Sequence, residues 1–230
     1  MLTTEGLMRL MTYLSPSFPV GAYTYSHGVE FAVEDGLVTS GETLRDWVEG
    51  ALLFGAGHSD GMLFCRAWTL ALNDDYTGLS GLNSFANALR PTAEMALECE
   101  AQGRAFLSTL LDVHPSEPLQ KLADAIKKID ELTAYPVAVG ALAAFEQIQC
   151  EPALVAYLHA FGANLVSAGV RLVPLGQTAG QKALMGLENA VKEAAQSAIE
   201  TDFQDIGACA PVIDWTSMQH ETQYTRLFRS

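Results

Sequence analysis

The sequence predicts an all-α protein, a single-domain bundle of about eight to ten helices with a C-terminal tail. Apolar residues recur with the spacing of one helix face in several stretches, the first of which contains Leu7, Leu10 and Leu14. Strict alternation of apolar and polar residues over the length of a strand is nearly absent. Glycines and prolines fall between the helical stretches and divide them. We therefore expect a helical domain over 1–202 and a tail over 203–230.

Capping residues and prolines set the expected ends of the helices. Gly36 is typical of the residue that follows a short helix, and Thr39 with Glu42 has the spacing of a capping box at the next helix. Proline lacks the N–H that the first helical turn leaves unpaired, so it often stands where a helix begins. Four prolines have such positions: Pro91, Pro118, Pro136 and Pro152. The expected helices span 5–14, 26–35, 41–56, 60–73, 79–89, 92–112, 118–132, 136–148, 152–170 and 178–201.

Two of these helices, 136–148 and 152–170, are rich in glycine and alanine. Small side chains let helix backbones approach closely, so we expect both helices at the centre of the bundle. The stretch 152–170 has no charged residue and could resemble a membrane span. It contains His159, Asn164 and Ser167, which would be unfavourable in lipid, so a core helix is the favoured interpretation.

The charge balance disfavours several classes of partner. The chain carries 27 acidic and 13 basic residues, a formal charge of −14. Binding to nucleic acid or to an anionic membrane depends mainly on Lys and Arg, so we expect neither. The start of the sequence lacks a basic region followed by an apolar run, so we expect no signal peptide and a cytoplasmic location. The cysteines form no C-x-x-C pair and are expected to be free thiols; they are Cys65, Cys99, Cys150 and Cys209.

Residues 57–61 match the G-x-S-x-G pattern of a hydrolase nucleophile elbow, with Ser59 as the nucleophile. That chemistry needs a strand, a strained turn and a helix in an α/β sheet, and no other part of the sequence alternates strand with helix. A turn between two helices, with Ser59 capping the second, is favoured. A helical serine hydrolase at Ser59 is kept as the alternative.

Other candidate sites are weaker. Asp74 and Asp75 could belong to a magnesium-dependent enzyme, but such sites need several converging carboxylates, and a loop between helices is the simpler interpretation. No histidine pairs at i+2 or i+4 with another His or Cys, so the sequence contains no visible metal cage. His27 and His220 are the two histidines beside segments that lack the helical pattern.

The first such segment, 15–30, is a loop with unusual chemistry. Two prolines restrict its backbone, Gly21 permits a turn, and Ser26 can cap the helix that follows. Tyr23 and Tyr25 add aromatic rings with polar ends. From the residues alone, a loop buried across helix ends and a protein-binding surface are equally supported.

The second segment is the C-terminal tail, whose end reads S-M-Q-H-E-T-Q-Y-T-R-L-F-R-S over 217–230. It combines Tyr, Leu, Phe and two Arg with many hydrogen-bonding groups. Arg and Tyr are enriched at interface hot spots, so the tail is expected to bind a partner and to order on binding. Packing of the tail on its own domain is the alternative.

These segments resemble the UreF family of urease accessory proteins, and the similarity extends over essentially the whole chain. The run 15–30 resembles the proline-glycine-aromatic opening of the family. The run S-A-G-V-R-L-V-P-L-G-Q over 167–177 resembles its late central motif. The end, 220–230, resembles the family ending H-E-T-Q-Y-S-R-L-F-R-S, with Thr225 in place of Ser, and Gln219 stands where the family has Arg.

The resemblance implies an all-α, homodimeric, non-catalytic protein without a cofactor. It would bridge the GTPase UreG and the scaffold UreD (also called UreH), and the complex would dock on apo-urease to insert nickel, which the complex would handle only transiently. A plain nickel carrier that uses His27, His220 or Cys209 is a further alternative.

Site residues follow from the resemblance by position. Glu30, Glu34 and Arg171 are expected to be exposed contacts for the GTPase, and 220–229 is expected to dock on the scaffold or to order near a dimer interface. The full partner-binding set is Glu30, Glu34, Arg171, Gln177, His220, Glu221, Tyr224, Arg226 and Arg229. The structural loop set is Pro19, Gly21, Tyr25, His27 and Gly28.

Overall fold

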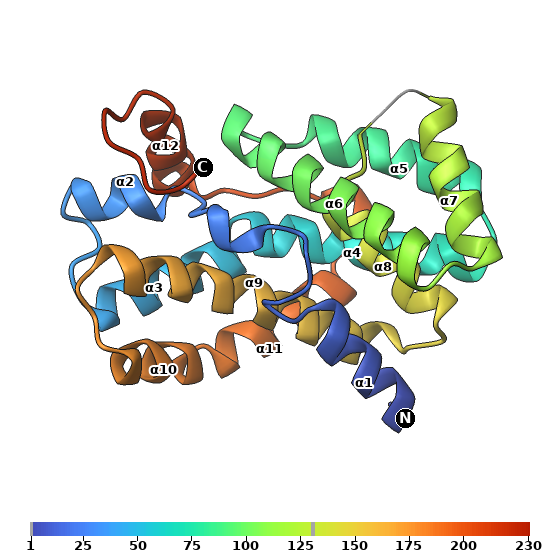
Figure 1. Cartoon of the computed structure of the whole chain (residues 1–230), viewed down its shortest axis with the longest axis horizontal. Coiled ribbons are helices and arrows are strands. Elements are labelled where there is room, and N and C mark those ends of the chain that lie inside the picture. The colour runs from blue at the N-terminus through green and yellow to red at the C-terminus, as the bar shows by residue number, and fades with distance from the viewer. Residues whose placement is uncertain (1, 130–131) are drawn as a thin grey trace.

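The computed structural model describes residues 2–129 and 132–230, and every regular element in these ranges is helical (Figure 1). The all-α prediction is therefore confirmed. The α-helices are α1 (Thr4–Tyr13), α2 (Val29–Glu34), α3 (Gly41–Leu53), α4 (Ala56–Leu72), α5 (Tyr76–Ala88), α6 (Ala93–Val113), α7 (Glu117–Lys128), α8 (Tyr135–Phe145), α9 (Cys150–Leu172), α10 (Gln177–Gly186), α11 (Glu188–Glu200) and α12 (Pro211–His220). Two short 3-10 helices, η1 (Ala22–Thr24) and η2 (Phe203–Asp205), lie in the connections.

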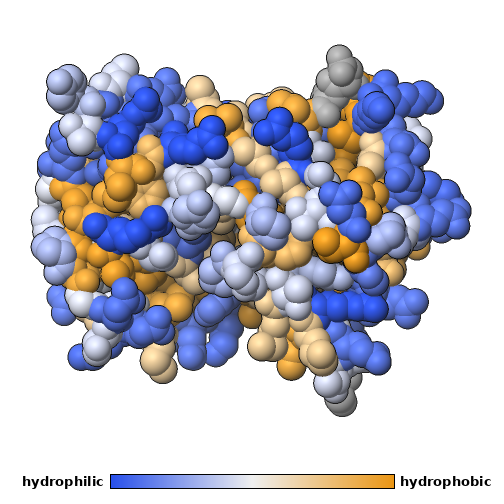
Figure 2. Space-filling model, in the orientation of Figure 1, coloured by the Kyte–Doolittle hydropathy of each residue, from blue (hydrophilic) through white to orange (hydrophobic). Residues whose placement is uncertain are grey.

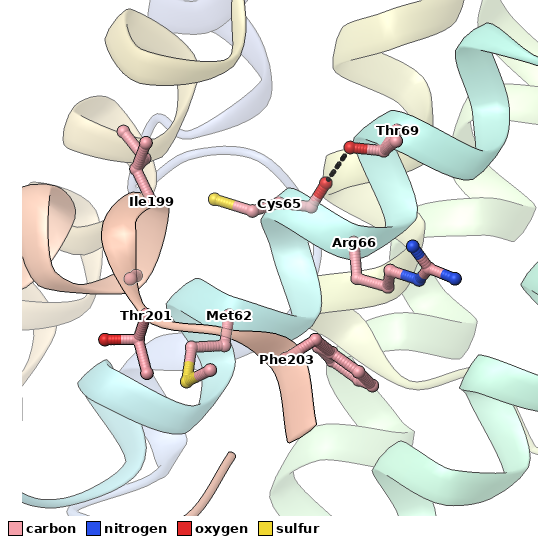
Figure 3. A pocket seen from close by; sticks show the side chains of 8 residues that line it. Met62, Cys65, Arg66, Thr69, Ile199, Thr201 and Phe203 are labelled. Atoms are coloured by element: carbon pink, nitrogen blue, oxygen red, sulfur yellow. Dashed lines mark hydrogen bonds between the residues drawn. The ribbon is translucent and has the colours of Figure 1, made fainter. Parts of the chain in front are cut away.

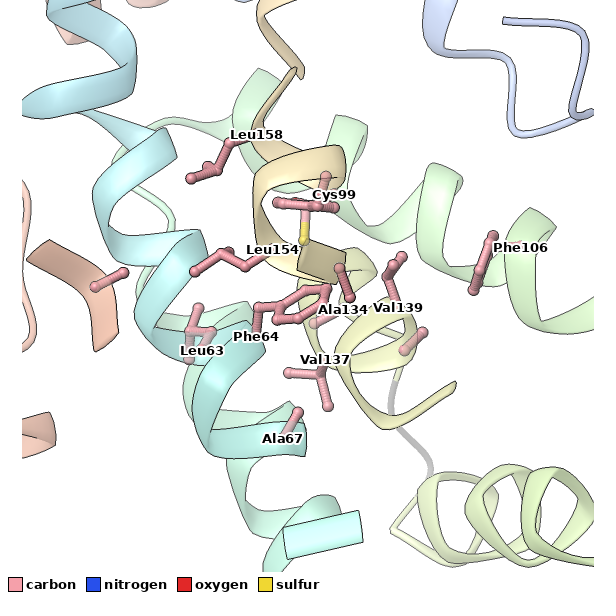
Figure 4. Close-up of a cluster of buried hydrophobic side chains, with 14 of the residues drawn as sticks. Leu63, Phe64, Ala67, Cys99, Phe106, Ala134, Val137, Val139, Leu154 and Leu158 are labelled. Atoms are coloured by element: carbon pink, nitrogen blue, oxygen red, sulfur yellow. The ribbon is translucent and has the colours of Figure 1, made fainter. Parts of the chain in front are cut away.

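The core forms around α8, which is buried from Pro136 to Ala144. Its Gly140 lies against α4 so closely that an added Cβ would be 2.4 Å from the backbone oxygen of Phe64. Figure 4 shows side chains of α4 facing those of α8 and the first half of α9. In α9, an added Cβ on Gly169 would lie 2.3 Å from Leu44. The small residues therefore place α8 and α9 in the centre, as expected.

α9 is also long and apolar enough to cross a membrane by length and composition. Half of its most apolar window is buried inside the protein, against α3, α4, α8 and α11. This burial favours the interpretation of α9 as a core helix.

Several helix ends differ from the prediction. The capping box at α3 uses Ser40 and Thr43, not Thr39 and Glu42: the Ser40 hydroxyl accepts from the Thr43 N–H at 3.2 Å, and the Thr43 hydroxyl accepts from the Ser40 N–H at 3.0 Å. The single helix predicted over 178–201 is divided into α10 and α11 at Leu187, a buried residue. For the helix predicted over 118–132, α7 ends at Lys128, and residues 130–131 lie outside the described residues.

The sequence pattern suggested a tail without a helix. The structure differs, because the tail contains α12. A usual surface helix buries its apolar face and exposes its polar face, and α12 does the opposite. Its buried face consists of Ile213, Thr216, Ser217 and His220, whereas Val212, Trp215 and Met218 point toward solvent. The sequence of α12 therefore lacks the apolar stripe by which a helix that faces the core is usually predicted. α12 packs on α2 and α6 at one end of the bundle (Figure 1).

Candidate functional site

The end of the chain folds back onto the loop before α2 through two main-chain hydrogen bonds. The Arg229 N–H donates to the Thr24 carbonyl at 2.8 Å, and the Ser26 N–H donates to the Ser230 carbonyl at 2.6 Å. The Ser26 hydroxyl donates to the same carbonyl at 2.6 Å. The C-terminal segment, which we define as residues 211–230, is therefore fixed on its own subunit next to α2 (Figure 1).

Glu30 is the main anchor of this segment. Its carboxylate accepts from the Leu227 N–H at 2.6 Å and from the Phe228 N–H at 2.9 Å. A carboxylate that accepts from backbone amides forms strong, charge-assisted hydrogen bonds. Glu30 is 6% exposed. The expectation that Glu30 is exposed is wrong, because the C-terminal segment covers its carboxylate and supplies its hydrogen-bond donors.

His220 joins two buried carboxylates. Its Nε2 lies 2.9 Å from Glu30 and its Nδ1 lies 2.8 Å from Glu94 on α6, while the side chain is 0% exposed. Both ring nitrogens can donate only when the imidazole is positively charged. Burial alone would lower the pKa of His220, but the hydrogen bonds and charges of Glu94 and Glu30 outweigh burial and raise it above the ordinary value. His220 is therefore a buried cation that links α2, α6 and α12.

Glu94 and Glu98 extend the cluster along α6. The Arg226 guanidinium lies 3.3 Å from Glu94. Glu98 accepts from the Gln102 amide at 3.0 Å and lies 3.1 Å from His27 Nδ1. These carboxylates are buried, and each has a basic partner, as buried charges require. We call Glu30, Glu94, Glu98, His27 and His220 the carboxylate-histidine cluster.

The loop before α2 is shaped to receive α12. Gly28 has φ +81°, and a Cβ at this position would lie 2.6 Å from the Thr216 hydroxyl. Only glycine combines this backbone conformation with so close an approach. Gly21 also has a left-handed φ of +74°, but it faces open space. Tyr25 and His27 are buried and Pro19 is exposed, so the part of this loop next to α2 is buried across helix ends and the part before it is not.

The structure brings together some of the predicted partner-binding residues and separates others. Glu34 is exposed and accepts from the Gln223 amide. Arg171 is exposed and stacks over the Phe228 ring, with its guanidinium carbon 4.3 Å from the ring centre. Gln177 is an exposed residue at the start of α10 and takes no part in the cluster. The remaining tail residues of the set are exposed: Glu221, Tyr224, Arg226 and Arg229.

Glu94 and Glu98 were not identified from the sequence. A signal was present, because Thr92 caps α6 and the two acids lie four residues apart beside the buried apolar residues Met95 and Cys99. Acidic residues on the core-facing side of a helix indicate a buried basic partner. The sequence does not indicate that this partner is His220, because 126 positions separate His220 from Glu94.

The alternative sites of the sequence do not assemble into reactive centres. Ser59 is a buried residue inside α4, whose N-cap is Gly55, so Ser59 does not cap this helix; its hydroxyl donates to the Ala56 carbonyl at 3.4 Å. α4 follows a helix, not the strand of a nucleophile elbow. Asp75 caps α5 by accepting from the Gly78 N–H at 2.8 Å. Among the described residues, no group of three or more His, Cys, Asp or Glu side chains could hold a metal ion.

Five large hydrophobic side chains of the C-terminal segment are exposed. On α12, Val212, Trp215 and Met218 point outward, and beyond it Tyr224 is fully exposed and Leu227 is 65% exposed. The backbone of Leu227 is held by Glu30, so the exposed side chain sits on an anchored chain. We call these five residues the outward apolar surface. Figure 2 shows further hydrophobic surface at the end of the molecule where α2, α3 and α9 meet.

Comparisons with known proteins agree with one another. A family model described as UreF matches residues 38–188. The urease accessory protein UreF of Granulibacter bethesdensis is 46% identical over 224 residues, which is 97% of this chain and 94% of that protein. UreF of Magnetococcus marinus is 44% identical over the full length of both chains, and UreF of Rhodopseudomonas palustris (strain BisB5) is 46% identical over 99% of this chain and 92% of that protein.

Proposed function

The chain belongs to the UreF family, whose members are accessory, non-catalytic proteins of urease maturation, and we propose that it acts there by bridging two partner proteins. The partners are the GTPase UreG and the scaffold UreD/UreH. By holding both, the protein couples GTP hydrolysis to nickel insertion into apo-urease. The observation that supports this proposal best is the outward apolar surface. It lies on a C-terminal segment whose backbone is held by hydrogen bonds to Glu30 and to the loop before α2.

The outward apolar surface is suited to binding the scaffold. Several large apolar side chains exposed on one segment are typical of a protein interface, and Tyr, Trp and Arg are the residues that most often dominate binding energy. Arg226 and Arg229 lie exposed beside Tyr224 and Leu227 in the sequence and add groups that can hold carboxylates. Because Glu30 and His220 already order the backbone, binding loses less conformational entropy than it would for a free tail.

The GTPase is proposed to bind near Glu34, Arg171 and Gln177, which are exposed. Glu34 and Arg171 both contact the C-terminal segment, through Gln223 and Phe228, so the two proposed binding areas adjoin. Gln177 lies apart, at the start of α10, and defines the far limit of the proposed GTPase area. We also propose that the protein is a cytoplasmic homodimer.

The test is co-purification of the scaffold with two double variants. Met218→Ser with Leu227→Ser removes two large side chains from the outward apolar surface. The matched control, Met185→Ser with Val113→Ser, removes two residues that are at least as exposed but lie on α10 and α6; Met218 is 47% and Met185 69% exposed, and Leu227 is 65% and Val113 67% exposed. We expect the first variant to lose the scaffold and the control to retain it. Normal scaffold binding by the first variant, with unchanged helicity, would refute the proposal.

For the GTPase, Arg171→Ala is compared with Arg66→Ala, an exposed arginine on α4. Loss of GTPase binding only in Arg171→Ala supports the proposed area, and equal binding by both variants rejects it. Size-exclusion chromatography with light scattering, with and without both partners, tests the dimer and the bridged complex in one experiment.

A further inference from the structure

Two cysteines that are 85 positions apart in the sequence meet at the side of the bundle. The Sγ atoms of Cys65, in the middle of α4, and Cys150, the first residue of α9, are 3.6 Å apart. Both side chains are partly exposed, whereas Cys99 is buried and Cys209 is an exposed residue before α12. The sulfurs are thus in contact, and both belong to a part of the surface that a small molecule can reach.

The contact between the two sulfurs is maintained by the connection from α8 to α9. Trp68 lies one helical turn after Cys65, and its Nε1–H donates to the Ile148 carbonyl at 2.8 Å. The Ile148 N–H donates to the Ala143 carbonyl at 2.8 Å, which closes the turn after α8. Ile148 precedes Cys150 by two residues, so these bonds hold the start of α9 against the face of α4 that carries Cys65. The pair is therefore built into the fold.

A cavity of about 140 Å³ lies beside Cys65. It is formed by α4, the end of α11 and η2, with Met62, Ile199 and Phe203 among its lining residues. Figure 3 shows the Cys65 side chain leaving α4 on the side of Ile199, away from Arg66. A water-sized reagent needs only a small part of this volume. The cavity gives such a reagent access to Cys65 and gives the Cys65 sulfur room to change rotamer. Cys150 does not line the cavity and is reached where it is itself partly exposed.

The two thiols are not equivalent. The hydrogen bond between the two thiols lowers the pKa of Cys150, against the opposing effect of burial. The same hydrogen bond, followed by burial, raises the pKa of Cys65. Cys150 also lies in the first turn of a long helix, where the helix dipole stabilises a thiolate. The position of Cys150 at the N-terminus of α9 therefore favours Cys150 over Cys65 as the nucleophilic sulfur.

We propose that Cys65 and Cys150 form a peroxide-sensitive thiol pair that closes to a disulfide joining α4 to α9. The Cys150 thiolate attacks one oxygen of hydrogen peroxide, which breaks the O–O bond and gives a sulfenic acid and hydroxide. The hydroxide removes the Cys65 proton and becomes water. The Cys65 thiolate then attacks the Cys150 sulfur and displaces a second hydroxide, which is protonated to water. In sum, two thiols and one peroxide give one disulfide and two waters.

The test uses the full chain with Cys209→Ser, because this exposed thiol could otherwise link two molecules. After treatment with hydrogen peroxide we expect a mass decrease equal to two hydrogen atoms, loss of two of the three remaining thiols, and a peptide in which Cys65 is joined to Cys150. Dithiothreitol should restore the original mass. The disulfide closes a long loop, so the oxidised chain should also melt at a higher temperature than the reduced chain.

Two further variants in the same background keep the proposal falsifiable. Cys65→Ser should stop at sulfenic or higher oxidation states of Cys150, and Cys150→Ser should react with peroxide at least tenfold more slowly than the parent chain. Serine is close to cysteine in size, and unchanged circular dichroism would confirm that both variants fold. Oxidation of the parent chain without a Cys65–Cys150 link, or equal peroxide rates in Cys150→Ser and the parent, would overturn the proposal.

Discussion

His220 and Glu30 are 190 positions apart in the sequence, yet His220 Nε2 lies 2.9 Å from a Glu30 oxygen in the interior of the protein. This contact, together with the one between His220 and Glu94, ties the last helix to the two elements that support it. Residues beyond His220 then use the second oxygen of Glu30 to fix the backbone at Leu227. The ordering of the C-terminal segment thus depends on a few buried charges.

The stability of the fold should fall as pH rises above neutrality. The pKa of His220 is raised in the folded state, so the positive charge stabilises the fold fully below the ordinary histidine pKa of about 6.5. This contribution is lost as the pH rises through the higher, folded-state pKa, and a tenfold difference in proton affinity between the folded and unfolded states corresponds to about 1.4 kcal/mol. Urea unfolding from pH 6 to pH 9 measures the effect. In His220→Gln the decline attributable to this group should disappear, and an equal decline in both proteins would contradict the prediction.

Removal of the histidine should be strongly destabilising. His220→Ala leaves Glu30 and Glu94 buried without their shared cation, and breaking a buried ion pair from one side typically costs about 3–5 kcal/mol. His159→Ala is the matched control, because His159 is exposed on α9. Chemical denaturation of both variants at pH 6.5 checks the prediction. Similar unfolding free energies for the two variants would show that the carboxylate-histidine cluster contributes little.

Neutralising Glu30 should loosen the C-terminal segment without unfolding the bundle. In Glu30→Gln the amides of Leu227 and Phe228 lose a charged acceptor, so their hydrogen exchange should accelerate. Glu34→Gln is the control, since Glu34 lies on the same helix but contacts only the Gln223 side chain in this segment. Exchange measured by mass spectrometry on peptides covering 221–230 should distinguish the two variants. Unchanged exchange in Glu30→Gln would mean that other contacts hold the segment.

Gly21 and Gly28, the two glycines with left-handed backbone in the loop before α2, should differ in their tolerance of alanine. Both Gly28→Ala and Gly21→Ala place a side chain at positive φ, which costs about 1 kcal/mol. At Gly28 the new Cβ would also lie 2.6 Å from the Thr216 hydroxyl and 3.0 Å from the Ser217 nitrogen, whereas at Gly21 it meets open space. Thermal unfolding should therefore show a clearly larger loss for Gly28→Ala. Equal losses would indicate that α12 can shift to accommodate a methyl group.

Much of the bundle was predictable because its helices carry regular apolar stripes and end at glycines or prolines. Gly36, with φ +78°, ends the turn after α2 as its position indicated, and Pro118 and Pro136 lie in the first turns of α7 and α8. α12 was not predictable in this way, because its buried face is mostly polar and its apolar face is exposed. Apolar periodicity predicts a helix whose apolar face is buried and whose polar face is exposed.

The candidate site was predictable only in part. The tail and the loop before α2 were identified by their residue types, and the structure places them in contact through Ser26 and Ser230. The partnership of Glu30 with His220 could not be inferred, because nothing local in the sequence specifies a contact across so many residues. The same holds for Cys65 and Cys150, which no short motif connects.

The most direct test of the account is hydrogen–deuterium exchange of the full chain with and without the scaffold UreD/UreH. If the C-terminal segment is the docking surface, protection should increase over 211–228 and remain unchanged in α5 and α7, on the other side of the bundle. The Met218→Ser, Leu227→Ser variant should show no such protection. A stable complex in which 211–228 exchanges as in the free chain, while another surface becomes protected, would contradict the account.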